Sequence, residues 1–449
     1  MSKKRFILLV LTLTLNVFML VGCGGKDNKE DNTSNTAATA TPDNSGASDT
    51  DADAKDPVTI KVVSSYGADD GNRKNFEDGI KGYEESTGNK VTESASNANE
   101  EWKASVQADF QVGAEPDVLF FFNGVDSNPL VEAGAVVSIE EIRKEYPDYA
   151  ANMKDDMMGA SPIDGKNYSV PVNGFWEAMF CNKTVLDAAG VTVPTDGYTW
   201  DQFLADCEKI KQAGYTPIAV SFHEVPHYWF EYTVLNNGGF ANHLNVPASV
   251  EDAAAKDWIN GLNDMKELYD KGYLPENALS AGDAETFQLM ADDKAAFALD
   301  GSWKCGWFAD NADPANFFVT LPPTKEARKA TELIGGISMG YYITTKAWED
   351  ESKREACVKF VEYMTSDDMV SKFSSAGNVT ALKNGVTPDA NANDLIKSVA
   401  DMNGKVSGVI GAVQDTISGE QKTDIFGNVK LICDGSMTPE DALTSMLGK

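Results

Sequence analysis

The chain has 449 residues, of which 42% are hydrophobic and 24% are charged, enough to bury one large domain or two lobes. Its 69 acidic and 38 basic residues give a formal net charge of −31. A surface this acidic repels phosphate backbones and anionic lipid, which argues against nucleic-acid binding and against electrostatic attachment to a membrane.

Residues 1–22 predict a secretory signal. A basic stretch at 3–5 precedes an apolar run at 6–21, which is shorter than the roughly 20 residues that span a bilayer. The run ends in LVGC (20–23), which resembles the bacterial lipobox. The resemblance implies cleavage before Cys23, lipidation of its thiol and anchoring on the extracytoplasmic face of the cell membrane. An uncleaved anchor with a chance cysteine is the alternative.

Residues 23–56 predict an acidic, disordered linker behind the lipid. They are rich in Gly, Asn, Ser, Thr, Ala and Asp and carry almost no large apolar side chains. Such a segment cannot bury enough surface to fold, so we expect a flexible tether between the membrane and the folded part.

The first folded segment alternates strand and helix patterns. Residues 58–67 alternate as a strand, and 71–88 place apolar residues on one face of a helix. A second strand and a second helix follow, and then a continuous apolar run at 116–124 that is typical of a strand buried on both faces. This β-α-β-α-β pattern predicts a doubly wound sheet, whose ligands bind at the carboxyl ends of the strands, here 66–70 and 121–123.

A second series of strands and helices follows. Residues 167–183 predict an extended chain that is long enough to pass between two lobes. Residues 199–214 predict a helix that Thr199 caps, with Gln202 completing a capping box. The remaining predicted elements are a strand at 217–222, a helix at 229–239, a strand at 295–303, extended chain at 335–347 and a helix at 351–366.

His223 and His227 have the H-E-x-x-H spacing of zinc peptidases. Such an enzyme needs both histidines on one helical face, whereas Pro226 inside the motif would break the helix at a cost of about 3 kcal/mol. A third ligand is also missing, since His243 is the only other histidine and no clear helix delivers Glu251. The stretch therefore predicts a strand-to-helix loop and no catalytic zinc.

Five cysteines follow Cys23, an odd number without a C-x-x-C pair. Cys207 and Cys357 lie on the apolar stripes of predicted helices. This pattern favours buried free thiols over a disulfide framework or a metal cluster.

The order and spacing of several motifs resemble the extracellular solute-binding lipoproteins of bacterial ABC importers, in the sugar-binding, maltose-binding-protein-like branch. The motifs are the lipobox, PDVLFFFNG (116–124), GKNYSVPVNGFWEAMFCNKTVLDAAGV (165–191) with TWDQF (199–203), FALDGSW (297–303), GGISMGYYITTKA (335–347), FVEYMTS (360–366) and MTPEDAL (437–443). Each motif alone is weak, but their order covers nearly the whole folded part.

The resemblance implies an α/β protein with the two-lobed periplasmic-binding-protein fold (type II-like), in which three hinge crossovers join two doubly wound sheets. It places the crossovers near 170–173, 334–338 and 365–367, the N-terminal lobe at 57–172 and 335–365, and the C-terminal lobe at 173–334 and 366–449. It also implies a monomer that binds a neutral (oligo)saccharide between the lobes and delivers it to the membrane permease, without a cofactor and without enzymatic activity.

A saccharide site needs aromatic rings for the apolar faces of the sugar and fixed polar groups for its hydroxyls. The resemblance implies that Trp303 is the stacking tryptophan. At a second position, where the maltose-type proteins carry a tryptophan, this chain has Phe121. The candidate ligand-binding residues are Tyr66, Asp69, Asp70, Phe121, Asn123, Trp176, Glu177, His227, Tyr228, Trp229, Asp300, Trp303, Ser338 and Tyr341. For each of them, a place in the core or at the rim is the alternative.

No cluster of Arg or Lys accompanies these positions, and Arg73 is the nearest basic residue. This favours a neutral ligand over a phosphorylated or acidic one. Two alternatives stay open. The acidic residues could hold a cationic solute such as a polyamine, or Asp69, Glu177 and Asp300 could serve a cell-surface glycoside hydrolase, which needs two acids about 5–10 Å apart.

Overall fold

Parallel pairing of the first three strands builds the first sheet, as the β-α-β-α-β pattern predicts. The computed structural model describes residues 56–68, 70–159, 161, 163–193, 197–386 and 391–448. Val62 of the central strand pairs with Glu93 on one side and Val118 on the other. The sheet has the order β2-β1-β3-β9, with β1 (Thr59–Ser64), β2 (Lys90–Ala95), β3 (Val118–Phe122) and the antiparallel β9 (Met339–Ile343).

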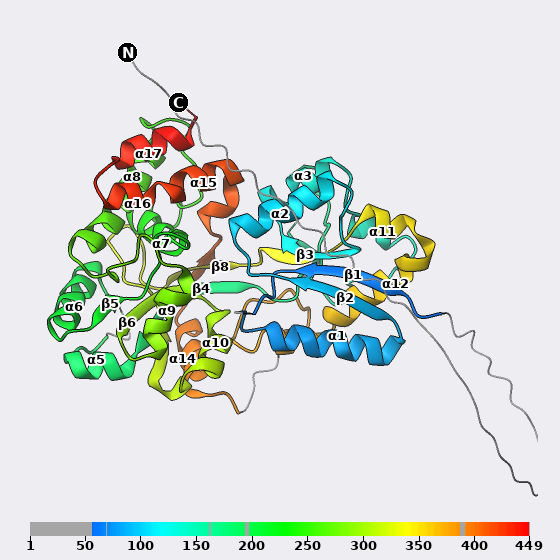
Figure 1. Cartoon of the computed structure of the whole chain (residues 1–449), viewed down its shortest axis with the longest axis horizontal. Coiled ribbons are helices and arrows are strands. Elements are labelled where there is room, and N and C mark those ends of the chain that lie inside the picture. Colours follow the sequence, from blue (N-terminus) through cyan, green and yellow to red (C-terminus); the bar gives the residue numbers. More distant parts are fainter. Residues whose placement is uncertain are drawn as a thin grey trace, which may run out of the picture. The chain divides into compact units, whose positions relative to one another are not determined.

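Helices cover both faces of this sheet, because apolar side chains leave its interior strands on both sides. Helix α1 covers one face and α2 the other (Figure 1). Phe76 and Tyr83 of α1 belong to one core cluster, and Trp102 and Val106 of α2 belong to another. The helices of this part are α1 (Arg73–Thr87), α2 (Glu100–Gln111), η1 (Gly124–Asp126), α3 (Asn128–Glu132), α4 (Ile139–Ile142), η2 (Asp155–Met157), α11 (Thr345–Glu349), α12 (Glu351–Met364) and α13 (Asp367–Phe373). We call this sheet and its helices the first lobe.

The second sheet forms around β4 (Phe175–Asn182), whose neighbours all run antiparallel to it. Its order is β10-β8-β4-β6-β5, with β7 also pairing β4. The other strands are β5 (Thr216–Ile218), β6 (Ala295–Gly301), β7 (Phe317–Thr320), β8 (Glu332–Gly336) and β10 (Gly408–Ile410).

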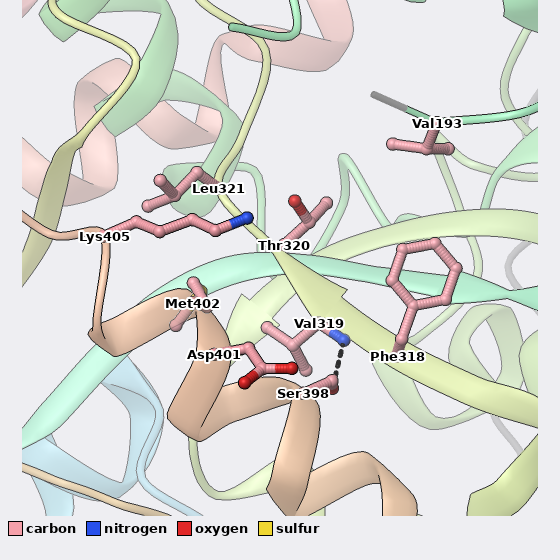
Figure 2. Close-up of a pocket in the computed structure, with 9 residues that line it drawn as sticks. All are labelled: Val193, Phe318, Val319, Thr320, Leu321, Ser398, Asp401, Met402 and Lys405. Carbon is pink, nitrogen blue, oxygen red and sulfur yellow. Dashed lines mark hydrogen bonds between the residues drawn. The ribbon is translucent and has the colours of Figure 1, made fainter. Parts of the chain in front are cut away.

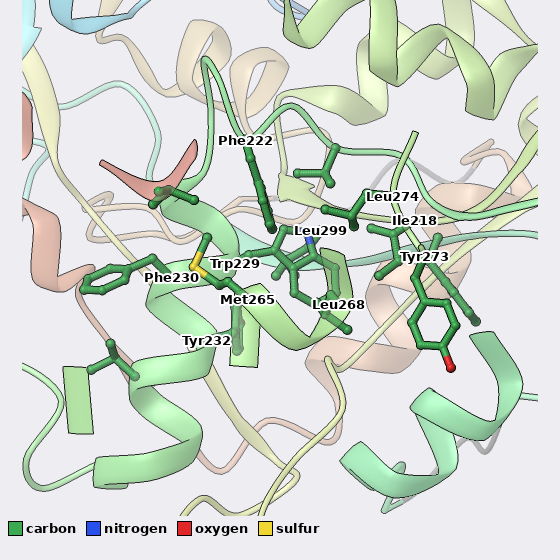
Figure 3. Packing of buried hydrophobic residues seen from close by; sticks show 14 of the residues in the cluster. Ile218, Phe222, Trp229, Phe230, Tyr232, Met265, Leu268, Tyr273, Leu274 and Leu299 are labelled. Atoms are coloured by element: carbon green, nitrogen blue, oxygen red, sulfur yellow. The ribbon is translucent and has the colours of Figure 1, made fainter. Parts of the chain in front are cut away.

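Alternation along β4 divides its side chains between two cores. Trp176 and Phe180 enter one core, while Met179 and Cys181 enter the other, in which Trp229 and Tyr232 of α7 are buried (Figure 3). The helices of this second lobe are α5 (Lys183–Ala189), α6 (Trp200–Gln212), α7 (His227–Gly238), α8 (Ala253–Asp270), α9 (Asp283–Ala291), α10 (Lys304–Asn311), η3 (Pro314–Asn316), α14 (Asp394–Asn403), η4 (Val413–Thr416), α15 (Gly419–Gly427), α16 (Val429–Cys433) and α17 (Pro439–Met446).

The two sheets confirm the predicted two-lobed α/β fold. The capping box of Thr199 and Gln202 is also confirmed at the start of α6. The strand predicted at 217–222 is shorter than expected, because β5 ends at Ile218 and the loop before α7 begins there. The described cysteines are free and buried, as predicted: Cys181, Cys207, Cys305, Cys357 and Cys433.

The chain passes between the lobes where its strands change sheets. Val170 still bridges Tyr341 of the first sheet, and β4 of the second sheet begins at Phe175. A second passage lies between β8 and β9, at residues 337–338. Both passages lie at the predicted crossovers near 170–173 and 334–338. That these crossovers act as hinges stays a prediction.

The third passage lies later than the sequence indicates. Met369 and Phe373 of α13 pack in the core of the first lobe, and Leu382 bridges Met153 there. We therefore place this crossover after Leu382 rather than at 365–367, because apolar side chains of α13 extend the buried surface of the first lobe.

Within the described part of the chain, every helix is too short or too polar to cross a bilayer. The predicted signal at 1–22, Cys23 and the predicted linker up to residue 55 lie outside the described residues.

Candidate functional site

Four rings of the second lobe form a row, which we call the aromatic row: Phe175, Trp303, Tyr228 and His227. Ring centroids lie 6.3 Å apart between Phe175 and Trp303, 5.8 Å between Trp303 and Tyr228, and 4.1 Å between Tyr228 and His227. Each of these side chains is only partly buried. The row therefore offers neighbouring aromatic surfaces on which flat, apolar faces of a ligand can stack.

Local chain geometry places the indole of Trp303 in this row. The residue follows β6 directly, and its ring folds back over Gly301, the last residue of that strand. A Cβ atom at position 301 would lie 2.2 Å from the ring, so only glycine leaves room for the indole.

Glu177 supplies a buried polar group beside the row. It pairs with Gly301 across β4 and β6, so its side chain lies on the sheet face that the Trp303 indole covers. The residue is 1% exposed, and its Oε2 atom has no hydrogen-bond partner. Burial raises the pKa of the carboxyl well above its usual value, and the charges of Glu231, Asp415 and Asp300 raise it further. A protonated carboxyl can both donate and accept a hydrogen bond.

Asp300 lies on the opposite sheet face from Glu177, since it precedes Gly301 in β6. Its carboxylate is 3.7 Å from the Lys304 ammonium, which also binds Asp283 at 2.7 Å. Burial raises the pKa of the Asp300 carboxyl to about 7, although Lys304 opposes the shift. Trp303 lies close enough to Asp300 to lower the pKa of its carboxyl, so Asp300 borders the aromatic row from the other sheet face, and its place in one site with Glu177 stays a prediction.

The raised pKa of Asp300 predicts how stability changes with pH. The folded protein holds this proton up to about pH 7, whereas an unfolded aspartate releases it near about pH 3.9. The stability that this group contributes is present below about pH 4 and is lost as the pH rises through about 7. The Asp300→Asn variant is therefore expected to show a smaller fall in melting temperature across this window than the parent protein.

Thermal unfolding of both proteins at several pH values measures this difference. Asp310→Asn, which removes an exposed carboxylate from α10, is the matched control and should keep the parent slope. Parallel profiles for Asp300→Asn and the parent would contradict the assignment.

At the end of β3 in the first lobe, the partly exposed ring is that of Phe122 and not that of Phe121. Phe121 is fully buried against Trp102, with ring centroids 5.4 Å apart. Phe122 is partly exposed, and the Lys103 ammonium lies 3.9 Å from its ring centroid. The partly exposed ring is therefore one residue later than predicted, at Phe122 instead of Phe121, because successive strand residues point to opposite faces.

Asn123 follows β3 and keeps a free donor. Its Oδ1 atom accepts hydrogen bonds from Ser169 at 2.6 Å and from Tyr342 at 2.9 Å. Its buried Nδ2 atom has no partner. Ser338 contributes its backbone oxygen, which accepts from the Asn123 backbone at 2.7 Å, so it positions Asn123.

Two predicted tryptophans are packed in the second lobe and do not belong to the row. Trp176 is 2% exposed and donates to the Ala376 oxygen at 3.2 Å. Trp229 is 1% exposed and stacks on Phe203 at 5.8 Å (Figure 3). Their neighbours Phe175 and Tyr228 take the exposed positions instead.

Two predicted tyrosines are packed in the first lobe. Tyr66 and Tyr341 flank Phe120, at centroid distances of 4.7 and 4.8 Å.

Asp70 accepts from the Asn72 backbone at 2.7 Å, and burial raises the pKa of its carboxyl to about 6. Asp69 lies outside the described residues.

The H-E-x-x-H spacing forms no helical pair of histidines. Helix α7 begins at His227 with Pro226 as its cap, so His223 lies in the preceding turn. The described residues include no group of three or more side chains placed to hold a metal. Burial, together with the nearby charges of Lys103 and Lys422, lowers the pKa of His227 to about 3, so its ring is neutral.

Two cavities of similar volume occur among the described residues. The one of about 140 Å³ lies between β7 and α14, with Phe318, Asp401 and Lys405 in its lining (Figure 2). The other, of about 130 Å³, is lined by Asn72 of the first lobe and Trp303 of the second. We assign the candidate site to the second cavity and the adjoining aromatic row, because the first cavity borders none of these rings.

Comparison with known families gives one match that covers most of the chain. The family model for the bacterial extracellular solute-binding protein matches residues 69–370. The multiple sugar-binding protein of Streptococcus mutans is 25% identical over 256 residues, and the melibiose/raffinose/stachyose-binding protein MelE of Bacillus subtilis is 23% identical over 266. Each alignment covers 54% of this chain and 58% of the relative, so the chain spans little more than half the length of these relatives.

Solved structures share the fold over nearly their whole length. A chitin oligosaccharide binding protein superposes with a TM-score of 0.75 at 21% identity, covering 88% of this chain and 98% of that protein. The solute-binding protein RafE in complex with raffinose gives a TM-score of 0.66 at 19% identity, covering 87% and 98%. At these identities the likeness establishes the fold.

Proposed function

Because the chain belongs to the bacterial extracellular solute-binding protein family, we propose that it captures a neutral saccharide between its lobes and delivers it to the permease subunits of an ABC importer. The observation that carries the proposal is the aromatic row with Glu177 beside it. Rings stack on the apolar faces of a sugar, and an unpartnered buried carboxyl binds a hydroxyl. The sugar-binding relatives support the same substrate class.

The protonation of the site favours a neutral ligand over a cationic one. The raised pKa values of Glu177 and Asp300 describe carboxyls that hold their protons more strongly than usual. A site for a polyamine instead needs ionised carboxylates that face the cation. A hydroxyl-rich ligand needs hydrogen-bonding groups, and a protonated carboxyl provides them.

The geometry also argues for binding without turnover. A glycoside hydrolase holds two carboxyl groups about 5–10 Å apart on either side of the scissile bond. Glu177 and Asp300 leave the second sheet on opposite faces, and the Asp300 carboxylate lies 3.7 Å from the Lys304 ammonium, an arrangement that differs from two acids facing each other across a sugar. We therefore propose a binding protein that releases its ligand unchanged, in agreement with the solute-binding family.

We further propose that the protein is a lipid-anchored monomer on the extracytoplasmic face of the cell membrane. The sequence at 20–23 supports lipidation of Cys23, and the acidic composition of 23–56 supports a flexible tether. Its partners are then the carbohydrate and the transmembrane permease subunits, with no cofactor required.

A saccharide panel tests the proposed function. Titration of the protein with raffinose-family, maltose-series and xylose-series saccharides is expected to change tryptophan fluorescence, because Trp303 lies in the aromatic row. Chromatography of the same mixtures should recover every saccharide intact. Putrescine and spermidine, the cationic controls, should give no saturable change. Cleavage of a saccharide would instead support a hydrolase, and saturable binding of a polyamine alone would contradict a sugar receptor.

A further inference from the structure

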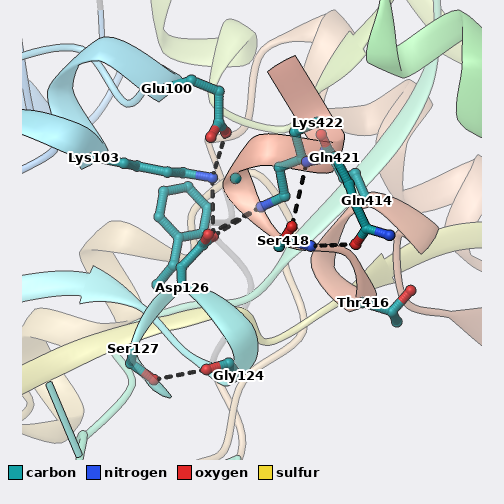
Figure 4. A network of polar contacts seen from close by, with 12 residues as sticks. Glu100, Lys103, Gly124, Asp126, Ser127, Gln414, Thr416, Ser418, Gln421 and Lys422 are labelled. Carbon is teal, nitrogen blue, oxygen red and sulfur yellow. Dashed lines mark hydrogen bonds and ion pairs between the residues drawn. The ribbon is translucent and has the colours of Figure 1, made fainter. Parts of the chain in front are cut away.

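A buried ion-paired cluster joins the two lobes. Asp126 of η1 lies 3.0 Å from Lys103 of α2 in the first lobe and 3.1 Å from Lys422 of α15 in the second lobe (Figure 4). The side chains of Asp126, Lys103 and Lys422 are 7%, 9% and 0% exposed. A buried charge that loses a partner is strongly unfavourable, so this cluster fixes how η1 and α15 lie against each other.

On the first-lobe side, the cluster holds the ring of Phe122. The Lys103 ammonium that binds Asp126 also lies 3.9 Å from the centroid of this ring. A cation at this distance is attracted to the negative face of an aromatic ring, and the attraction is stronger where water is excluded. Phe122 is the last residue of β3 and remains partly exposed. Lys103 therefore connects Asp126 to an aromatic ring that keeps part of its surface available.

On the second-lobe side, the cluster adjoins the His227 end of the aromatic row. Lys422 and Phe426 lie four residues apart, on one face of α15. The Phe426 ring packs on His227, with ring centroids 5.8 Å apart. The same helix face therefore carries the cation that binds Asp126 and the ring that packs on the last ring of the row.

We propose that this cluster positions Phe122 of the first lobe beside His227, so that the ring of Phe122 extends the aromatic row across the lobes. This inference rests on the proposed saccharide binding. Lys103 is the common neighbour of the two rings, since it lies over Phe122 and its charge acts on His227. The three charged residues of the cluster are then positioning residues, which act on a saccharide through the ring that they hold.

A double-mutant cycle tests this positioning by calorimetric titration with the saccharide that binds. Phe122→Ala should weaken binding by about tenfold, because it removes the first-lobe ring. Lys422→Met keeps the apolar stem but removes the ammonium that binds Asp126 across the lobes, and it should weaken binding by a similar factor. The double variant should bind about as weakly as either single variant, and not about a hundredfold more weakly than the parent, because a misplaced ring contributes nothing to lose.

Two substitutions outside the cluster are the matched controls. Lys430→Met removes an exposed ammonium from the neighbouring α16, and Phe110→Ala removes a partly buried ring near the end of α2. Both should keep the parent Kd. Asp126→Asn breaks the same contact from the first lobe, and it takes the place of Lys422→Met in the cycle if that variant does not unfold cooperatively.

The cycle separates this inference from the proposed function. Additive losses in the double variant would overturn the positioning role while leaving saccharide binding intact. Parent affinity in Phe122→Ala, or in the cluster variant that unfolds cooperatively, would overturn it as well. The absence of binding of every saccharide by the parent protein would overturn the proposed function, and this inference with it.

Discussion

Replacing Trp303 with alanine is expected to weaken saccharide binding by at least about 30-fold, or about 2 kcal/mol, with the fold intact. The indole contacts both neighbouring rings of the aromatic row and covers Gly301, so its loss removes the centre of the stacking surface. Its side chain is only partly buried, and removing it should therefore cost little stability. Isothermal titration with the saccharide identified by the panel gives the Kd of both proteins.

The matched control for this variant is Trp307→Ala. Trp307 lies in α10, the helix that begins directly after Trp303, is also partly buried and packs edge-on against Phe287 at 5.0 Å, outside the aromatic row. Its removal should lower the melting temperature and leave the Kd nearly unchanged. A Trp303→Ala protein that keeps the parent affinity would remove the aromatic row from the binding surface.

Glu231→Ala is expected to lower the free energy of unfolding by about 3–5 kcal/mol, because it leaves buried polar groups without a partner. Glu231 is fully buried in α7, and its carboxylate accepts from the backbone of Val413 at 2.7 Å and of Gln414 at 2.8 Å. His243, also fully buried, lies 3.0 Å from the same carboxylate. One side chain therefore ties α7 to η4 and to the loop that carries His243.

Denaturant unfolding monitored by circular dichroism measures this loss. Glu420→Ala, which removes an exposed glutamate from the first turn of α15, is the control and should change the free energy of unfolding by less than about 1 kcal/mol. A similarly small change for Glu231→Ala would mean that water replaces the carboxylate at these backbone groups. Saccharide affinity in the folded variant should fall only modestly, because Glu231 is fully buried and does not belong to the aromatic row.

Much of the fold follows from local patterns in the sequence. The continuous apolar run of β3 and the one-sided helices on either side of it predict a sheet covered on both faces. The capping box of Thr199 and Gln202 marks the start of α6 correctly. These features depend on residues within a few positions of each other, so a single sequence carries them.

The candidate site is harder to predict, because it depends on which face each side chain takes. Motif resemblance points to these turns, but Phe121, Trp176 and Trp229 are each one position away from a partly exposed ring. The alternation of side chains along β4 could have predicted that Trp176 is buried. Trp176 shares its sheet face with Ala178 and Phe180 and therefore enters a core.

The contacts between the lobes had no signal in the sequence. Lys422 and Asp126 are 296 positions apart, and neither lies in a motif or in a run of charge. From the sequence alone, each of these two charged residues is expected to be exposed on the surface. Only the folded chain brings them together and buries them.

Free thiols can report local opening of the fold through their rate of chemical modification. The described free cysteines are Cys181, Cys207, Cys305, Cys357 and Cys433. A thiol reacts only when reagent reaches it, and burial raises the pKa of the Cys181 and Cys207 thiols well above the usual value, which suppresses the reactive thiolate. The rate at which each sulfur is alkylated in native buffer will therefore report how often its surroundings open. The alkylation rate of Cys357 measures opening of the first lobe, and that of Cys181 measures opening of the second lobe. Mass spectrometry can follow the two rates separately without any engineered residue.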